Sequence, residues 1–256
     1  MSRLAYACLA PAEPRGLAAL RAWLVDRIKR KALRRLHADP RGERLVLRMY
    51  LAAEDATERA LQEELLPRSP AWLTRQLNQH LADERRHVAL FVDALRAAGD
   101  SAQQRLAPDW LSRRKIARWD RVARRYASCF AQGVLVPVYA TGLCAEQMAT
   151  RVLTRHCDVL GDAHALYPLF ASVLADERRH VRLCETTLRR MVAPGEVAAL
   201  TALMREIRAI EAGYALTGAI AIYLASWAIR PLRPLKRRPE STRPGPRQNR
   251  HTHGTS

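Results

Sequence analysis

Apolar residues recur at spacings of three and four along most of the chain, with alanine, leucine, arginine and glutamate between them. This spacing is the helical period, and these residue types favour helices. Proline and glycine interrupt the pattern and divide it into seven segments. The sequence therefore predicts an all-α protein with helices over residues 16–37, 41–66, 71–98, 111–132, 137–156, 169–192 and 196–229.

The same interruptions, with changes in composition, divide the chain into four parts. Residues 1–40 form a basic, amphipathic segment, and residues 41–193 form the helical body. Residues 194–230 form one long C-terminal helix. Residues 231–256 are rich in proline, arginine and serine, so we expect a basic, disordered tail.

The helical body contains an internal repeat. The octapeptide of residues 81–88 recurs letter for letter at residues 174–181. A nearly equal offset aligns the preceding helices and places Glu54 on Glu146. The sequence therefore predicts two helical hairpins of the same design, separated by a long crossover.

Each octapeptide carries a glutamate and a histidine three residues apart, which lie on one face of a helix. A single glutamate lies about 30 residues earlier, the length a helix needs to turn and return to the same height. One such pair is more often a solvated helix face, but two identical copies argue against that interpretation. Buried carboxylates need a cation, and carboxylates with imidazoles suit iron or manganese. The candidate metal ligands are Glu54, Glu84, His87, Glu146, Glu177 and His180.

With these motifs, residues 42–192 resemble the ferritin-like di-iron carboxylate proteins. The Asp-Glu-x-Arg-His form looks most like their oxygen-activating branch, which includes the ribonucleotide reductase small subunit, methane monooxygenase hydroxylase, acyl-carrier-protein desaturases and arylamine N-oxygenases. The resemblance implies a ferritin-like four-helix bundle whose six candidates bind two iron ions, with Glu84 and Glu177 as bridges. It also implies that Asp83 and Asp176 accept hydrogen bonds from the ligand imidazoles. Ordinary salt bridges are the alternative for these two aspartates.

Five neighbours of the motifs have simpler explanations. His80 precedes Glu84 by one turn, but its repeat partner is a valine, so we expect it at the surface or beside the site. Glu58 is likewise expected beside the site or exposed, and Cys184 in the core. Tyr50 and Gly142 occupy matching positions one turn before the single glutamates. A tyrosine there can hydrogen-bond to the site and a glycine can leave room for oxygen or substrate, but ordinary packing explains both equally well.

The charge of the chain lies mainly at its two ends. The 43 Lys+Arg and 25 Asp+Glu give a net charge of +18, of which residues 1–41 and 230–256 carry +7 each and the body only +4. This distribution argues against nucleic acid as the main partner, because basic ends serve membrane surfaces and protein partners equally well.

Residues 212–229 contain no charged side chain and are followed by five arginines and lysines up to residue 238. This segment is compatible with membrane contact, with a buried helix and with a homodimer seam. The basic helix at residues 16–37 has the same alternatives, an anionic surface or packing on the bundle. The five cysteines form no CxxC pair and no apolar signal segment opens the chain, so we expect a cytoplasmic protein, with membrane association as the open alternative.

The sequence thus predicts a di-iron, O2-activating oxygenase or oxidase, with manganese or a mixed centre as the alternative metal. The expected substrate is a small apolar or aromatic organic molecule that is hydroxylated, desaturated or N-oxygenated, with electrons from a donor protein. Two other functions stay open. One is a ferroxidase or rubrerythrin-like peroxidase, and the other is a tRNA-modifying di-iron hydroxylase whose residues 113–125 bind phosphates.

Overall fold

The computed structural model describes residues 3–11, 13–100 and 109–229, and no strand occurs in these ranges. The prediction of an all-α protein is therefore confirmed. The α-helices of the described residues are α1 (Leu17–His37), α2 (Pro40–Ala60), α3 (Ala71–Ala97), α4 (Trp110–Tyr126), α5 (Leu135–Leu160), α6 (Tyr167–Met191) and α7 (Val197–Ala228).

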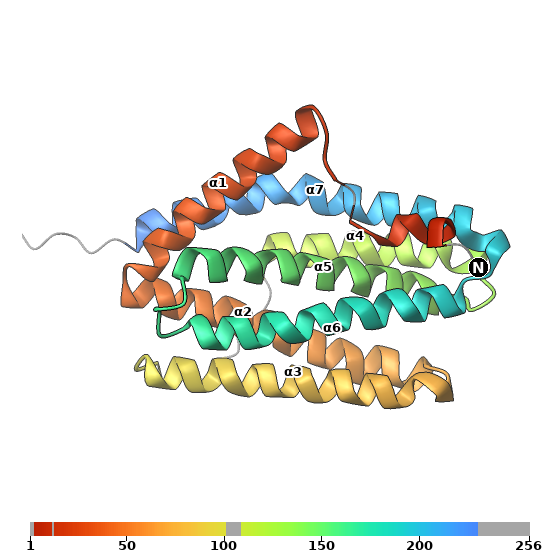
Figure 1. Ribbon diagram of the computed structural model, residues 1–256, viewed down its shortest axis with the longest axis horizontal. Coiled ribbons are helices and arrows are strands. Elements are labelled where there is room, and N and C mark those ends of the chain that lie inside the picture. Colours follow the sequence, from red (N-terminus) through yellow and green to blue (C-terminus); the bar gives the residue numbers. More distant parts are fainter. Residues whose placement is uncertain (1–2, 12, 101–108, 230–256) are drawn as a thin grey trace, which may run out of the picture.

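The helices of the repeat pack as two hairpins that lie side by side (Figure 1). Helix α2 packs on α3, helix α5 packs on α6, and α3 meets α6 between the hairpins. Helix α4 lies in the crossover and packs on α5 and α7. Helix α7 runs along the length of the molecule and covers α5, and α1 packs on α7 and α2.

Several helix ends follow local sequence signals. The side chain of Asp39 accepts a hydrogen bond from the Arg41 amide at 2.8 Å, and Pro40 follows it as the first residue of α2. Helix α5 ends at Gly161, whose φ of 70° is a conformation that glycine adopts easily. Proline 168 lies in the first turn of α6, where its missing N–H is not needed.

Other ends differ from the prediction. The segment predicted as a helix over residues 41–66 is α-helical to Ala60, then continues as a π-helical turn, Leu61–Leu65, and a 3-10 turn, Leu66–Arg68. Pro67 contributes to this change because it has no N–H to continue the α-helical pattern. Helix α4 ends at Tyr126, six residues before the predicted end.

The basic tail of residues 231–256 and the connection around residue 108 lie outside the described residues. A short 3-10 helix, Arg3–Leu9, has no counterpart in the prediction. The Tyr6 hydroxyl donates to the carbonyl oxygen of Val192 at 2.8 Å, so this segment is fixed by a long-range contact that no local pattern reveals.

The junction between α1 and α2 is tightly packed around Gly42. A Cβ atom at this position would lie 2.2 Å from the carbonyl oxygen of Leu36. Only glycine therefore allows the start of α2 to approach the end of α1 so closely. This approach sets the direction in which α1 leaves the bundle.

Helix α7 with its preceding turn, Pro194–Ala228, is long and apolar enough to cross a membrane, by length and composition only. Its most apolar window has a mean hydropathy of 1.3, and 11% of that window is buried within the protein. Among the alternatives raised by the sequence, a fully buried helix is therefore wrong for this segment.

The core consists of two apolar clusters with a polar layer between them. On α3, Leu73 and Leu77 belong to one cluster and Phe91 and Leu95 to the other. Between them, the buried residues of α3 are polar except for Leu81: His80, Asp83, Glu84 and His87. Helices α2, α5 and α6 show the same order, so all four helices carry their buried glutamates at one level.

Candidate metal centre

The polar layer between the apolar clusters contains all six residues that the sequence predicts as metal ligands. Each of these six residues is between 0% and 7% exposed to solvent. Helix α2 contributes one glutamate, α5 contributes another, and α3 and α6 each contribute a glutamate and a histidine. These side chains fall into two adjoining groups, whose donor atoms lie within 4.8 Å of one another in each group. The first contains Glu54, Glu84, His87 and Glu177, and the second contains His80, Glu84, Glu146 and His180.

Two carboxylates face both groups. One oxygen of Glu84 lies 3.8 Å from Nδ1 of His87, and the other lies 3.3 Å from Nδ1 of His180. The two oxygens of Glu177 show the same arrangement, at 3.7 Å from His87 and 3.9 Å from His180. These are the two residues that the family resemblance implies as bridges, and their oxygens are directed towards two separate positions.

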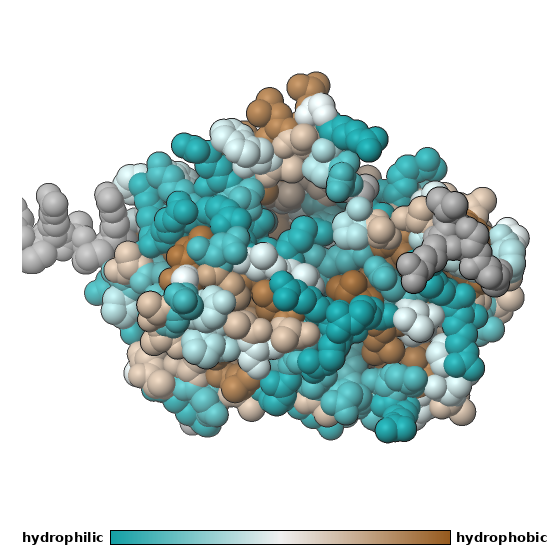
Figure 2. Space-filling view, in the orientation of Figure 1, coloured by the Kyte–Doolittle hydropathy of each residue, from teal (hydrophilic) through white to brown (hydrophobic). Residues whose placement is uncertain are grey.

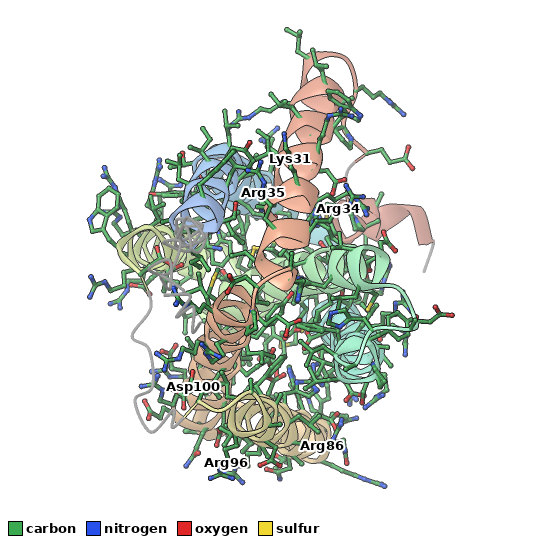
Figure 3. The ribbon with its side chains drawn as sticks, turned by 90° about the vertical axis from the view of Figure 1, so that its left-hand side faces the viewer. Lys31, Arg34, Arg35, Arg86, Arg96 and Asp100 are labelled. Carbon is green, nitrogen blue, oxygen red and sulfur yellow. The ribbon has the colours of Figure 1, made fainter. Side chains whose placement is uncertain are left out.

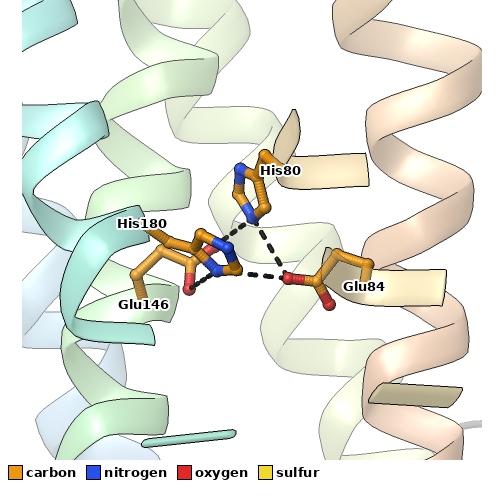
Figure 4. A group of neighbouring side chains, drawn as sticks. All are labelled: His80, Glu84, Glu146 and His180. Carbon is orange, nitrogen blue, oxygen red and sulfur yellow. Dashed lines mark hydrogen bonds and ion pairs between the residues drawn. The ribbon is translucent and has the colours of Figure 1, made fainter. Parts of the chain in front are cut away.

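His80 is buried and belongs to the second group of possible ligands (Figure 4), so the prediction of a surface position is wrong, and a position beside the site stays open. Its residue is 4% exposed, and Nε2 lies 3.1 Å from Glu84 and 3.4 Å from Glu146. Its ring stacks on that of His180 with centroids 3.7 Å apart. The repeat did not indicate a polar side chain here, because Val173 holds the matching position.

A second pattern did contain the signal for His80. The buried face of α3 repeats every three or four residues from Leu73 through Leu77 to Phe91 and Leu95. Continued through the polar segment, this period places residue 80 inward. The helical period therefore predicts the burial of His80, and its repeat partner Val173 is buried as well.

The two predicted partner aspartates bind the histidines of the opposite motif. Nε2 of His87 on α3 lies 3.1 Å from Asp176 on α6. Nε2 of His180 lies 3.4 Å from Asp83. With Nε2 occupied in this way, the Nδ1 atom of each ring is the one directed towards the glutamates.

Two arginines surround these aspartates. Arg86 and Arg179 each form ion pairs with both Asp83 and Asp176. Burial on its own would raise the pKa of Asp176, but its hydrogen bonds to His87 and Arg86 outweigh burial and lower this pKa. Asp176 therefore stays ionised and accepts a hydrogen bond from the imidazole N–H of His87. The salt bridges expected as the alternative are present together with the imidazole contacts.

Burial of so many carboxylates in one layer changes their acidity. Burial raises the pKa of Glu54 to about 8 and that of Glu146 well above its ordinary value, with nearby carboxylates adding to both effects. Burial alone would lower the pKa of His87 and His80, yet hydrogen bonds to the glutamates raise these pKa values to about 11 and about 10. Protons on these side chains therefore balance part of the negative charge within the chain itself.

Hydrogen bonds among these residues do not satisfy every buried atom. Nδ1 of His180 and one carboxylate oxygen of Glu84 are buried and have no hydrogen-bond partner in the described part of the protein. Both atoms belong to the groups of possible ligands. A lone pair on imidazole nitrogen and a carboxylate oxygen are what a divalent cation of the iron or manganese type binds, so the donor set fits a metal ion.

The other neighbours of the motifs lie around this layer. The Tyr50 hydroxyl lies 2.7 Å from Nδ1 of His156, so its hydrogen bond goes to a residue outside the candidate ligands. Glu58 forms an ion pair with Arg85 at 3.2 Å. Cys184 is buried, as the sequence predicts, and burial raises the pKa of its thiol well above the ordinary value. A Cβ atom at Gly142 would have no atom within 4 Å, so there is open space beside this position.

Comparisons with known proteins do not identify a relative: no protein-family model, no curated protein and no solved structure matches the chain. The fold and the site therefore define the class of this protein by themselves. It is an all-helical protein with buried groups of histidine and glutamate side chains that could hold metal ions.

Proposed function

We propose that the two groups form one dinuclear metal centre of the ferritin-like di-iron type. The observation that carries the proposal is the convergence of four buried glutamates and three buried imidazoles from four helices. Glu84 and Glu177 would bridge the two ions because each directs one oxygen towards each side of the layer. Glu54 and His87 would complete one ion's ligands, and the remaining donors would complete the other's.

The reaction we propose is the oxidation of a small apolar or aromatic molecule by dioxygen, through hydroxylation, desaturation or N-oxygenation. Two ferrous ions would supply the electrons that reduce dioxygen, and a donor protein would restore them. A carboxylate-rich ligand set supports iron over copper and zinc, which prefer softer donors. Manganese in one or both positions fits the same donors.

The chain's own residues have three roles in this proposal. Asp83 and Asp176 fix the rotation and tautomer of the two opposite imidazoles, so that Nδ1 points inward. The apolar clusters above and below the layer exclude water from both ends. The open space beside Gly142, one turn from Glu146, provides room for dioxygen or part of a substrate.

The test of the centre is metal content. Full-length protein is loaded anaerobically with Fe(II), desalted and analysed for iron per chain. We expect about two ions in the wild type and a large loss in Glu84→Gln, which faces both positions. Glu58→Gln is the matched control because Glu58 lies on the same hairpin but pairs with Arg85. A wild type that binds no iron or manganese would contradict the proposal.

The test of the reaction is oxygen consumption by the iron-loaded protein with and without organic substrates. Product formation that depends on the substrate would support the oxygenase. Rapid and repeated oxidation of added Fe(II), with no organic product, would instead identify a ferroxidase. Decay of added peroxide would identify a peroxidase.

The structure gives less support to the tRNA-modifying alternative. Two arginines of α4 that the sequence offers for phosphate binding are already paired with acids, Arg125 with Glu206 and Arg124 with Asp120. Their charge is partly neutralised, which weakens attraction for a polyanion. Retention of iron-loaded protein on tRNA at moderate salt would reopen this alternative.

A further inference from the structure

A row of large apolar side chains on α1 and α7 is exposed. On α1, Leu20, Trp23 and Leu24 are between 42% and 60% exposed. On α7, Leu224 is 60% exposed and Trp227 41%. Figure 2 shows apolar residues gathered at the projecting end of α1, at the top of the view. With this exposure, the five side chains lie outside the core.

Cations lie along the same surface. Arg27 lies over the ring of Trp23 at 5.5 Å, and Arg35 lies over that of Trp227 at 3.8 Å. Lys31 lies 5.9 Å from the ring of Tyr223. In Figure 3, Lys31 and Arg35 lie on the part of α1 that is next to α7. The surface therefore combines aromatic rings, exposed leucines and positive charge.

A groove lies between α1 and α7. It measures about 320 Å³ and is lined by Leu24, Arg27, Ile28, Lys31, Ile220 and Tyr223. Its lining combines the apolar side chains of Leu24, Ile28 and Ile220 with two cations, Arg27 and Lys31. Such a groove fits the acyl chain and acidic headgroup of a lipid at the membrane interface.

We propose that the α1–α7 surface docks the protein on an anionic lipid bilayer. Residues 212–229 contain no acidic side chain, and the chain continues with five arginines and lysines up to residue 238. The acid of α1, Asp26, is paired with Arg30 and Arg155 at 2.6 Å each. No acid of the surface therefore opposes attraction to acidic headgroups.

The contacts between α1 and α7 favour docking over spanning. Arg21 donates to the carbonyl oxygen of Ala212 at 2.9 Å, and Arg35 reaches Trp227, so α1 lies along the apolar half of α7. A membrane-spanning α7 would carry α1 and its cations Arg27 and Lys31 into the hydrocarbon, which is unfavourable. At the interface, the apolar side chains enter the bilayer while the cations stay among the headgroups.

The same charges argue against a second copy of the chain as the occupant. A twofold contact through this surface would place Arg27 and Lys31 of each copy close to those of the other. Residues 212–229 contain no acidic side chain that could neutralise these cations in such a contact. Electrostatic repulsion would therefore oppose the dimer, whereas an acidic bilayer neutralises the same cations.

The test is sedimentation of the full-length protein with vesicles. We expect binding to phosphatidylcholine mixed with phosphatidylserine at about 0.1 M salt, weaker binding to phosphatidylcholine alone, and release at about 0.5 M salt. Leu20→Ser with Leu24→Ser should lower the partition coefficient about fivefold or more. Arg27→Gln with Lys31→Gln should reduce the preference for phosphatidylserine.

Matched variants separate this surface from general effects. Met49→Ser changes a residue of α2 that is 46% exposed, close to the 42% of Leu24, and should bind as the wild type does. Arg75→Gln with Arg182→Gln removes the same charge elsewhere. Circular dichroism and iron content should be equal in all variants, so the result is independent of the proposed metal centre.

Four results would overturn the proposal. The wild type could fail to bind phosphatidylserine vesicles at low salt, or Leu24→Ser and Met49→Ser could bind equally well. Binding that survives alkaline carbonate extraction would mean that α7 spans the bilayer. A dimer without lipid that Leu20→Ser and Leu24→Ser dissociate would identify a second copy as the occupant.

Discussion

His87 and Asp176, which belong to different copies of the repeated octapeptide, lie 3.1 Å apart through Nε2 and a carboxylate oxygen. In the reverse pair, Nε2 of His180 lies 3.4 Å from a carboxylate oxygen of Asp83. Each motif therefore orients the histidine of the other. These two reciprocal histidine–aspartate contacts connect α3 to α6 at the level of the candidate metal centre.

Removing one aspartate of these two histidine–aspartate contacts should weaken metal binding without removing a ligand. We expect Asp176→Asn to lower the affinity for iron about 10- to 100-fold, because an amide no longer fixes the tautomer of His87. Competition with a chelator measures this change. Asp93→Asn is the control, since Asp93 also lies on a motif helix but forms an exposed pair with Arg96. Equal affinities for the two variants would contradict the positioning role.

His80 should matter both with and without metal. In His80→Val, which copies the residue at the matching repeat position, Glu84 and Glu146 lose a cationic partner. We expect the metal-free variant to lose about 3–5 kcal/mol of unfolding free energy, because buried charge is left unpaired. The metal-loaded variant should bind about one ion firmly. Chemical unfolding and iron analysis measure the two effects, and unchanged iron content would show that His80 is not a ligand.

Metal binding should depend on pH through Glu54. Burial raises the pKa of this carboxyl to about 8, so it holds a proton at neutral pH that a metal must displace. Affinity should therefore rise with pH between about 6 and 8, by at most about tenfold per unit for this one proton. Titration in two buffers of different ionisation enthalpy counts the released protons. Glu54→Gln should release fewer protons, and no difference would contradict the assignment.

His156 should make the fold sensitive to acid. Burial lowers its pKa to about 3, whereas in the unfolded chain the pKa is near 6.5. The unfolded state binds the proton first, so this stability is complete above about pH 6.5 and is lost as the pH falls towards 3, at about 1.4 kcal/mol per unit. Unfolding free energies measured from pH 7 to 4 should fall less steeply in His156→Gln. Tyr50→Phe removes the hydrogen bond but keeps the titration, so its slope should match the wild type.

Two glycines should respond in opposite ways to the same substitution. Gly142→Ala lies inside α5 where a Cβ meets no atom, so it should stabilise the fold by about 0.5–1 kcal/mol. Gly42→Ala places a Cβ against the Leu36 carbonyl oxygen and should destabilise the fold. Thermal unfolding measures both. A loss of activity in the more stable Gly142→Ala would show that substrate or dioxygen uses the open space.

Most of the fold was predictable because helices depend on local sequence. The three- and four-residue period predicted all seven α-helices, although the predicted ends differ from the observed ones, as at α5, which was predicted to end at residue 156 and ends at Leu160. The π-helical turn after Ala60 and the contact of Tyr6 with Val192 were not predictable. The contact of Tyr6 depends on how distant segments pack, and neither feature is encoded in the period of one helix.

The convergence of Glu54, Glu146 and the two repeated pairs followed from spacing and duplication in the sequence alone. A helix of fixed rise must return to the same height after about 30 residues, so these residues had to share one level of the molecule. The identity of the metal and the reaction stay predictions, because the same donors suit more than one ion and more than one use of dioxygen.

The tertiary structure alone decided which residue faces which. It places His80 in the polar layer and leaves apolar side chains of α1 and α7 exposed. It also pairs Asp176 with His87 and Asp83 with His180, each across the two motifs. The sequence determines the inward face of each helix through its period. The rotation and height at which one helix meets another follow from packing across the whole core, and these set every contact between helices.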